Sequence, residues 1–195
     1  EDLDLIHGGI VHLGSVSREL GLPGMDRASE DSITARELSL AESAGTRIHI
    51  AHVSTAGAAA YIRTARARGV RATCETAPHY FLLTQELIRK EDADYRMNPP
   101  LREEADVEAI RAAMNALPVD FREILELRVV QQLPYEQLRF ITKAPVTDLK
   151  DLYLSTDAEL LEDYRGRSLL VFASQWSINF ILKRNPGLEL SETAQ

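Results

Sequence analysis

The order of strand, helix and strand within residues 47–75 constrains the fold of this chain more than any other feature. The apolar pattern predicts a buried strand over residues 47–53, a helix over residues 56–68 that ends before Gly69, and a second strand over residues 70–75. Because the links are short, we expect two neighbouring parallel strands of an α/β fold. Functional side chains of such folds lie at the C-terminal ends of the strands.

Further helices flank this unit. A helix is predicted over residues 30–44, with Ser29 as its N-cap and Gly45 directly after its last turn. A short apolar segment over residues 78–84 precedes one or two helical turns, and another helix is predicted over residues 103–116.

His52 is the candidate for a functional side chain, because it lies near the C-terminal end of the first predicted strand. Alternation along a strand places Ile48, Ile50 and His52 on one face and His49 on the other. The two histidines are therefore not expected to bind the same ion. The alternative is a buried His52 whose ring is satisfied by a backbone carbonyl.

Composition excludes several classes of protein. The chain of 195 residues is 45% hydrophobic and 27% charged, as globular domains are, and its net charge of -8 argues against binding nucleic acid or anionic membranes. No signal peptide is seen, and the longest apolar-rich run, residues 169–182, is too short to span a bilayer. Cys74 is the only cysteine, which fits a reducing, cytoplasmic compartment, and a small buried role is expected for it.

Four short motifs occur in order and at plausible spacing. They are Leu40-Ala41-Glu42 with Gly45, His52-Val53-Ser54-Thr55, Pro78-His79-Tyr80 and Asn98-Pro99-Pro100-Leu101-Arg102. With them, residues 1–113 resemble the dihydroorotases of the cyclic amidohydrolase group. Glu1-Asp2 is similar to the tail of that family's His-x-Glu-Asp motif.

The resemblance implies a site and a chemistry. In that family two zinc ions activate a water molecule that opens a small cyclic amide. His52 matches one zinc ligand and Asn98 matches a residue that contacts the ring substrate. His79 matches its motif, but we assign it no ligand role.

Most of the family's metal ligands are missing. The sequence lacks the His-x-His pair, the carboxylated bridging ligand, the histidine before Glu1 and the later Asp-His-Ala-Pro-His motif. A catalytic zinc takes about three protein ligands, and this chain offers one matched ligand. We therefore expect an incomplete module without hydrolase activity of its own, assign no catalytic residue and do not expect zinc to be bound.

Residues 117–154 resemble region four of bacterial sigma factors, a helix-turn-helix unit that reads DNA. The resemblance lies in Leu117-Pro118, residues 121–128, residues 133–138 and residues 144–150, and it implies DNA contacts from Thr147 and Lys150. Asp148 and Asp151 depart from the family's pattern, and residues 116–195 carry nine basic and twelve acidic residues, a net charge of -3. Because DNA binding depends on neutralising phosphates, a helical hairpin that only packs is the favoured alternative.

These patterns predict a helix-rich α/β fold with two segments. Residues 1–115 would form a partial (β/α) barrel fragment with a small parallel sheet, and residues 116–195 an all-helical segment. The exposed sheet edges require cover, either from the C-terminal helices or from a second copy of the chain. A natural or artificial chimera without selected activity is the remaining alternative.

Overall fold

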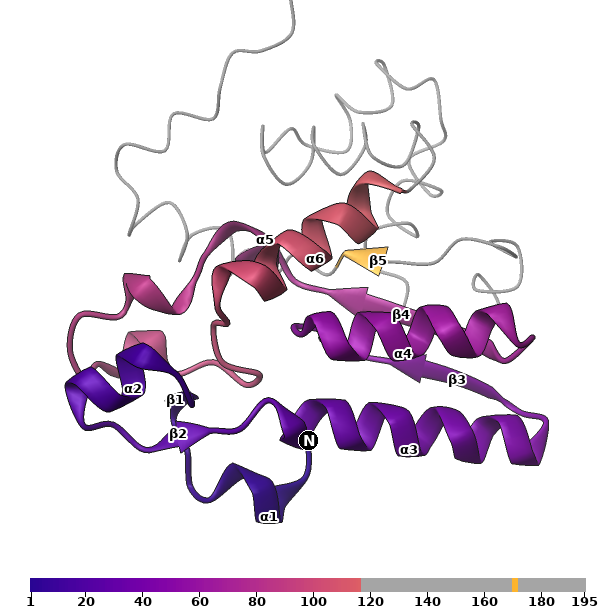
Figure 1. Ribbon diagram of the computed structural model, residues 1–195, viewed down its shortest axis with the longest axis horizontal. Coiled ribbons are helices and arrows are strands. Elements are labelled where there is room, and N and C mark those ends of the chain that lie inside the picture. Colours follow the sequence, from indigo (N-terminus) through magenta and orange to yellow (C-terminus); the bar gives the residue numbers. More distant parts are fainter. Residues whose placement is uncertain (117–169, 172–195) are drawn as a thin grey trace, which may run out of the picture.

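The computed structural model describes residues 1–116 and 170–171. Helices and strands follow one another along the chain as Figure 1 shows. The helices are α1 (Leu3–Ile6), α2 (Ser15–Leu20), α3 (Ala28–Ala44), α4 (Ala56–Ala67), α5 (Pro78–Leu82), η1 (Gln85–Leu87), η2 (Ala93–Tyr95) and α6 (Glu104–Asn115). The strands are β1 (Val11–His12), β2 (Gly24–Met25), β3 (Arg47–Ile50), β4 (Arg71–Thr76) and β5 (Leu170–Val171).

The predicted parallel pair is confirmed. β3 and β4 are parallel neighbours, with Arg47 opposite Arg71 and Ile50 opposite Cys74. α3 and α4 lie alongside these strands and run in the opposite direction (Figure 1). β3 ends at Ile50, however, three residues before the predicted end of that strand.

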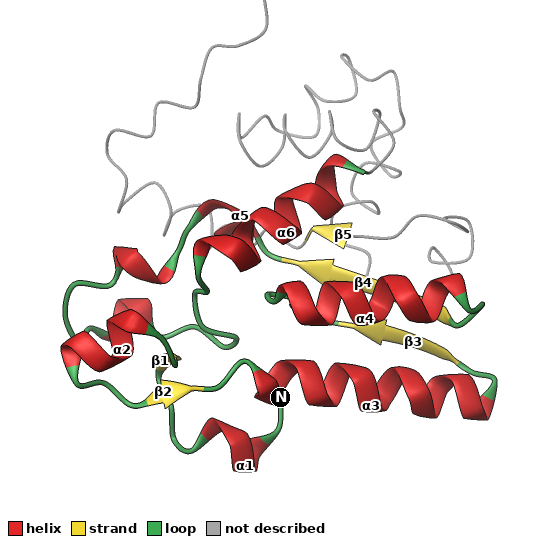
Figure 2. Ribbon diagram, in the orientation of Figure 1, coloured by secondary structure: helices red, strands yellow, loops and turns green. Residues whose placement is uncertain are grey.

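β5 corrects the prediction of an all-helical C-terminal segment. Leu170 and Val171 fall within residues 116–195, for which only helices were predicted, yet they pair in parallel with Glu75 and Thr76 of β4 (Figure 2). The second edge of β4 offers backbone partners, and such tertiary pairing overrides a local helical pattern. The other helices predicted in this segment, with Thr147 and Lys150, lie outside the described residues.

A second, two-stranded sheet escaped prediction. β1 and β2 are parallel, with Val11 opposite Gly24 and His12 opposite Met25. Gly24 is required there, because a Cβ atom would lie 2.7 Å from the Leu13 Cα atom. Strands of two residues show no periodicity, so the pattern gave no sign of them.

The capping of α3 also differs from the prediction. The helix begins at Ala28, and its N-cap position is Arg27 rather than Ser29. Asp26 supplies the side-chain cap, since its Oδ1 accepts a hydrogen bond of 2.8 Å from the Ala28 N–H. The end of the helix is as predicted, with Gly45 in the left-handed conformation at φ 61°.

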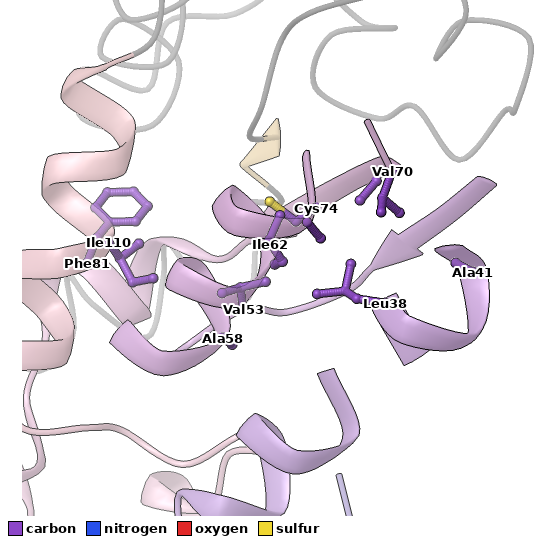
Figure 3. Packing of buried hydrophobic residues seen from close by; sticks show 11 residues of the cluster. Leu38, Ala41, Val53, Ala58, Ile62, Val70, Cys74, Phe81 and Ile110 are labelled. Carbon is purple, nitrogen blue, oxygen red and sulfur yellow. The ribbon is translucent and has the colours of Figure 1, made fainter. Parts of the chain in front are cut away.

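One face of the β3–β4 sheet carries the hydrophobic core. Figure 3 shows side chains of α3, α4 and β4 meeting there, among them Leu38, Ile62 and Cys74. Cys74 is buried as predicted, and burial raises the pKa of its thiol to about 12. The predicted helix over residues 103–116 is confirmed as α6, which adds Ile110 to this core.

The opposite face of the same sheet is polar. Strand alternation places Arg47, His49, Arg71, Thr73 and Glu75 on it. Across the two strands, His49 Nδ1 lies 2.8 Å from Thr73 Oγ1. The site considered next adjoins this face.

The structure does not test the predicted boundary between the two segments of the chain. The boundary between residues 115 and 116 stays a prediction, because the described residues stop one residue after α6. Within the described ranges, no helix has the length and apolarity needed to cross a membrane.

Candidate functional site

A cavity of about 380 Å³ lies beside the C-terminal end of β3, near the start of α3. His52 and Asn98, which come from two different sequence motifs, both line it. Its other polar lining includes Glu1, Glu30 and His49. The structure therefore brings together the two site residues that the sequence predicted.

His52 lies in the turn that follows β3. Its φ of 55° is in the left-handed region, which is uncommon for residues other than glycine. The side chain is 48% exposed, and its Nε2 lies 3.5 Å from Glu75 Oε1. His52 is therefore not buried, contrary to the alternative that the sequence left open.

The side chains of His49 and His52 both approach the Glu75 carboxylate. His49 Nε2 lies 3.4 Å from Glu75 Oε2, so the two imidazoles approach different oxygens of one carboxylate. The predicted separation of His49 and His52 onto opposite faces fails because the strand alternation stops at Ile50. The sequence had not singled out Glu75, although it lies directly after the last β4 residue that pairs with β3.

The donor set does not fit a catalytic zinc ion. Within residues 1–116, no group of three or more histidine, cysteine, aspartate or glutamate side chains could hold a metal. His52 and His49 instead approach the Glu75 carboxylate, and a catalytic zinc takes about three protein ligands in one tetrahedron. No chemical step is therefore assigned to zinc in this chain.

The segment that carries Asn98 is anchored at both ends. The hydroxyl of buried Tyr80 donates a hydrogen bond of 2.8 Å to the Pro99 carbonyl. The Arg102 carbonyl accepts a hydrogen bond of 2.8 Å from the Gln85 N–H. Asn98 itself is exposed at the cavity, so its carboxamide is available to a ligand.

Arg102 joins this segment to the turn after His52. Its side chain is 1% exposed, and each of its three nitrogens has a partner. Nε donates to Ser54 Oγ at 3.0 Å, Nη2 donates to Glu30 Oε2 at 3.0 Å, and Nη1 donates to His12 Nδ1 at 3.1 Å. A buried arginine of this kind fixes the relative positions of His52 and Asn98.

His12 is neutral in this network. A ring nitrogen that accepts a hydrogen bond from a guanidinium carries no proton. Burial, followed by the charge of Arg102, lowers the pKa of His12 to about 4. The sequence gave no sign of this role, because Arg102 lies far away along the chain.

Acidic side chains satisfy the amino end of α4. Glu30 Oε1 accepts hydrogen bonds from the N–H groups of Ser54 at 2.8 Å and Thr55 at 3.2 Å. Asp106 Oδ1 accepts from the Ala56 N–H at 2.9 Å. These three N–H groups, at and just before the start of α4, are therefore not free for an anion.

Glu1 contributes a buried carboxyl group to the cavity. The Asp2 N–H donates to the Ser29 carbonyl at 2.7 Å, which holds this end of the chain against α3. The Glu1 side chain is 9% exposed, and its Oε1 lies 3.7 Å from Arg102 Nη2. Neither Glu1 oxygen has a hydrogen-bond partner in the described part of the chain, and burial raises the pKa of the group.

His79 lies apart from the cavity lining. Its ring is buried, packs edge-on against Tyr80 and has no hydrogen-bond partner for Nδ1 among residues 1–116. Burial lowers its pKa to about 4. His79 stays without an assigned ligand role.

Comparison with known proteins relates part of this chain to dihydroorotases. The dihydroorotase of Geobacter sp. (strain M21) is 55% identical over 114 residues, which are 58% of this chain and 27% of that protein. Those of Citrifermentans bemidjiense and Trichlorobacter lovleyi are 56% identical over 114 residues and 52% identical over 120 residues. The chain thus spans about a quarter of the length of these relatives. No family model matches it.

Among solved structures, a D-hydantoinase from Bacillus sp. AR9 matches 44% of this chain and 19% of its own, with a TM-score of 0.43 and 34% identity. A dihydropyrimidinase from Brevibacillus agri NCHU1002 matches 44% of this chain and 19% of its own, with a TM-score of 0.42 and 32% identity. TM-scores this low do not establish a shared fold. The relation to cyclic amidohydrolases therefore rests on the sequence matches to dihydroorotases.

Proposed function

We propose that this chain is an incomplete dihydroorotase-like module that binds a small cyclic amide and has no hydrolase activity of its own. One observation carries the proposal: His52 and Asn98, from two separate motifs of the dihydroorotase-like part, line the same cavity. A cavity of about 380 Å³ has the size of a small-molecule site.

The absence of hydrolysis follows from the donor set. Opening an amide ring with water requires a nucleophile stronger than neutral water. The described residues offer no three-ligand metal set, and the Glu75 carboxylate beside the cavity is held between His49 and His52. Ring binding without ring opening is the expected behaviour.

The test combines metal analysis, turnover and binding on the full chain. We expect less than stoichiometric zinc, no ring opening of dihydroorotate with or without added zinc, and shifts in the NMR signals of His52 and Asn98 on adding a cyclic amide. Asn98→Ala should abolish the shift at His52, whereas Asn115→Ala, outside the cavity, should leave it. Stoichiometric zinc with turnover would overturn the claim of inactivity, and absence of binding by any cyclic amide would overturn the claim of a ligand site.

Two further proposals remain. One concerns a segment outside the described residues, and the other concerns an unpaired edge of β3. The helix-turn-helix alternative depends on residues 117–154, which lie outside the described ranges. Dimerisation is proposed because the outer edge of β3 has no strand partner among residues 1–116 and 170–171. Size-exclusion chromatography with light scattering tests dimerisation, and a strictly monomeric species would exclude it.

A further inference from the structure

We infer that the cavity selects neutral cyclic amides over rings that carry a carboxylate, the reverse of what the name of its relatives suggests. This inference rests on the proposed function. Its first support is the charge of the lining: Glu1 and Glu30 are acidic, and no lysine or arginine lines the cavity in the described part of the chain. A ligand carboxylate would face two acidic side chains and would find no lysine or arginine side chain on the lining to pair with.

The nearest guanidinium cannot supply that cation. Arg102 is 1% exposed, lies 3.0 Å from Glu30 and 3.7 Å from Glu1, and each of its nitrogens already donates to the protein. Freeing it for a ligand would leave the Glu30 carboxylate buried without its partner. Such a broken buried pair is strongly destabilising.

The backbone donors near His52 are also occupied. A helix start is the usual alternative site for a carboxylate, because its first N–H groups are free. Here Glu30 accepts the N–H groups of Ser54 and Thr55, just before α4, and Asp106 accepts that of Ala56, the first residue of the helix. The three N–H groups that follow His52 most closely on this side are therefore taken, and the described lining has no lysine or arginine side chain for a ligand carboxylate.

A neutral ring amide, by contrast, finds complementary groups. Glu1 and Asn98 both line the cavity, and the Asn98 carboxamide offers one donor group and one acceptor. The adjacent N–H and C=O of a cyclic amide match such a pair, and Ile33 and Ile50 provide apolar surface for the ring.

The test uses dihydrouracil and dihydroorotate, which share one ring and differ by a carboxylate. Each is titrated into the full chain and followed by calorimetry or NMR. We expect dihydrouracil to bind at least about tenfold more tightly, with a smaller difference at high salt. Dihydroorotate binding equally or more tightly would overturn the inference and leave the proposed function standing. If neither ring binds, the proposed function itself is overturned, and the inference with it.

Two matched variants separate charge from other effects. Leu3 lines the cavity and is 83% exposed, so Leu3→Arg adds a cation at the rim without disturbing the core. It should raise the affinity for dihydroorotate severalfold and leave that for dihydrouracil unchanged. Leu40→Arg, at a 56% exposed position outside the lining, should change neither. An unchanged ratio of the two affinities in Leu3→Arg would contradict a charge-based selection.

Discussion

At the scale of single residues, Arg102 is the buried cation on which the site depends. Removing it leaves the Glu30 carboxylate, 3.0 Å away, without its charge partner in a buried place. Arg102→Met should therefore lower the free energy of unfolding by about 3–5 kcal/mol, measured by urea denaturation. Arg96→Met, which removes an exposed ion pair with Glu91, should cost less than about 1 kcal/mol. Equal losses in the two variants would contradict this view of the network.

His12 makes the stability depend on pH. Its pKa falls from 6.5 to about 4 on folding, so between these values the unfolded chain takes up a proton that the folded chain refuses. The contribution is fully present above pH 6.5 and is lost as the pH falls toward 4, by roughly 3 kcal/mol in total.

His12→Asn checks this dependence, because its side-chain oxygen still accepts from Arg102 but does not titrate. Denaturant unfolding between pH 4 and pH 8 should show a shallower loss of stability in the variant. Above pH 7 the two proteins should show parallel curves. A variant with an unchanged slope below pH 6 would exclude His12 as the titrating group.

The sequence identified His52 and Asn98 but not the groups that position them. Their motifs mark them locally, whereas the contacts of Glu75 and Arg102 join parts of the chain that only the fold brings together. The left-handed backbone at His52 likewise depends on a contact between distant parts of the chain. Glu30 fixes the N–H groups that follow it, and no periodicity along residues 47–53 encodes that contact.

At the scale of elements, the contact between α3 and α4 requires a glycine. A Cβ atom at Gly57 would lie 2.4 Å from Asp31 Oδ2, and Asp31 Oδ1 is held by the Thr55 hydroxyl at 2.6 Å. Gly57→Ala should therefore destabilise the protein, although alanine is worth about 1 kcal/mol more than glycine inside a helix.

The same substitution should change sign when Asp31 is shortened. In an Asp31→Ala background the obstacle is gone, and Gly57→Ala should stabilise by up to about 1 kcal/mol. Thermal unfolding of the four proteins of this double-mutant cycle measures the coupling. Additive effects would show that Asp31 is not the obstacle.

Elements with clear periodicity and short links were predictable, and the others were not. The β3, α4 and β4 order gave the parallel pair because a short crossover admits few topologies. β1 and β2 were missed because two residues carry no pattern. The cap of α3 was missed because Asp26, and not the expected Ser29, accepts the Ala28 N–H.

At the scale of the whole molecule, β5 ties a distant part of the sequence to the dihydroorotase-like part. Leu170 and Val171 cover the edge of β4 at Glu75 and Thr76. Replacing both with proline removes backbone donors from this pairing. We expect faster hydrogen exchange at the C-terminal end of β4, with Arg71 to Thr73, which pair with β3, still protected. Unchanged exchange at Thr76 would show that β5 does not protect this edge.

The pairing of β4 with β5 also has a consequence for synthesis. A chain emerges from the ribosome N-terminal end first, so β4 and its partner β3 are complete long before residue 170 is made. Throughout that interval β4 offers an unpaired strand edge to any neighbour, which is the situation that leads to aggregation. We therefore expect the nascent chain to depend on β5, or on a chaperone in its place, to cover this edge of β4.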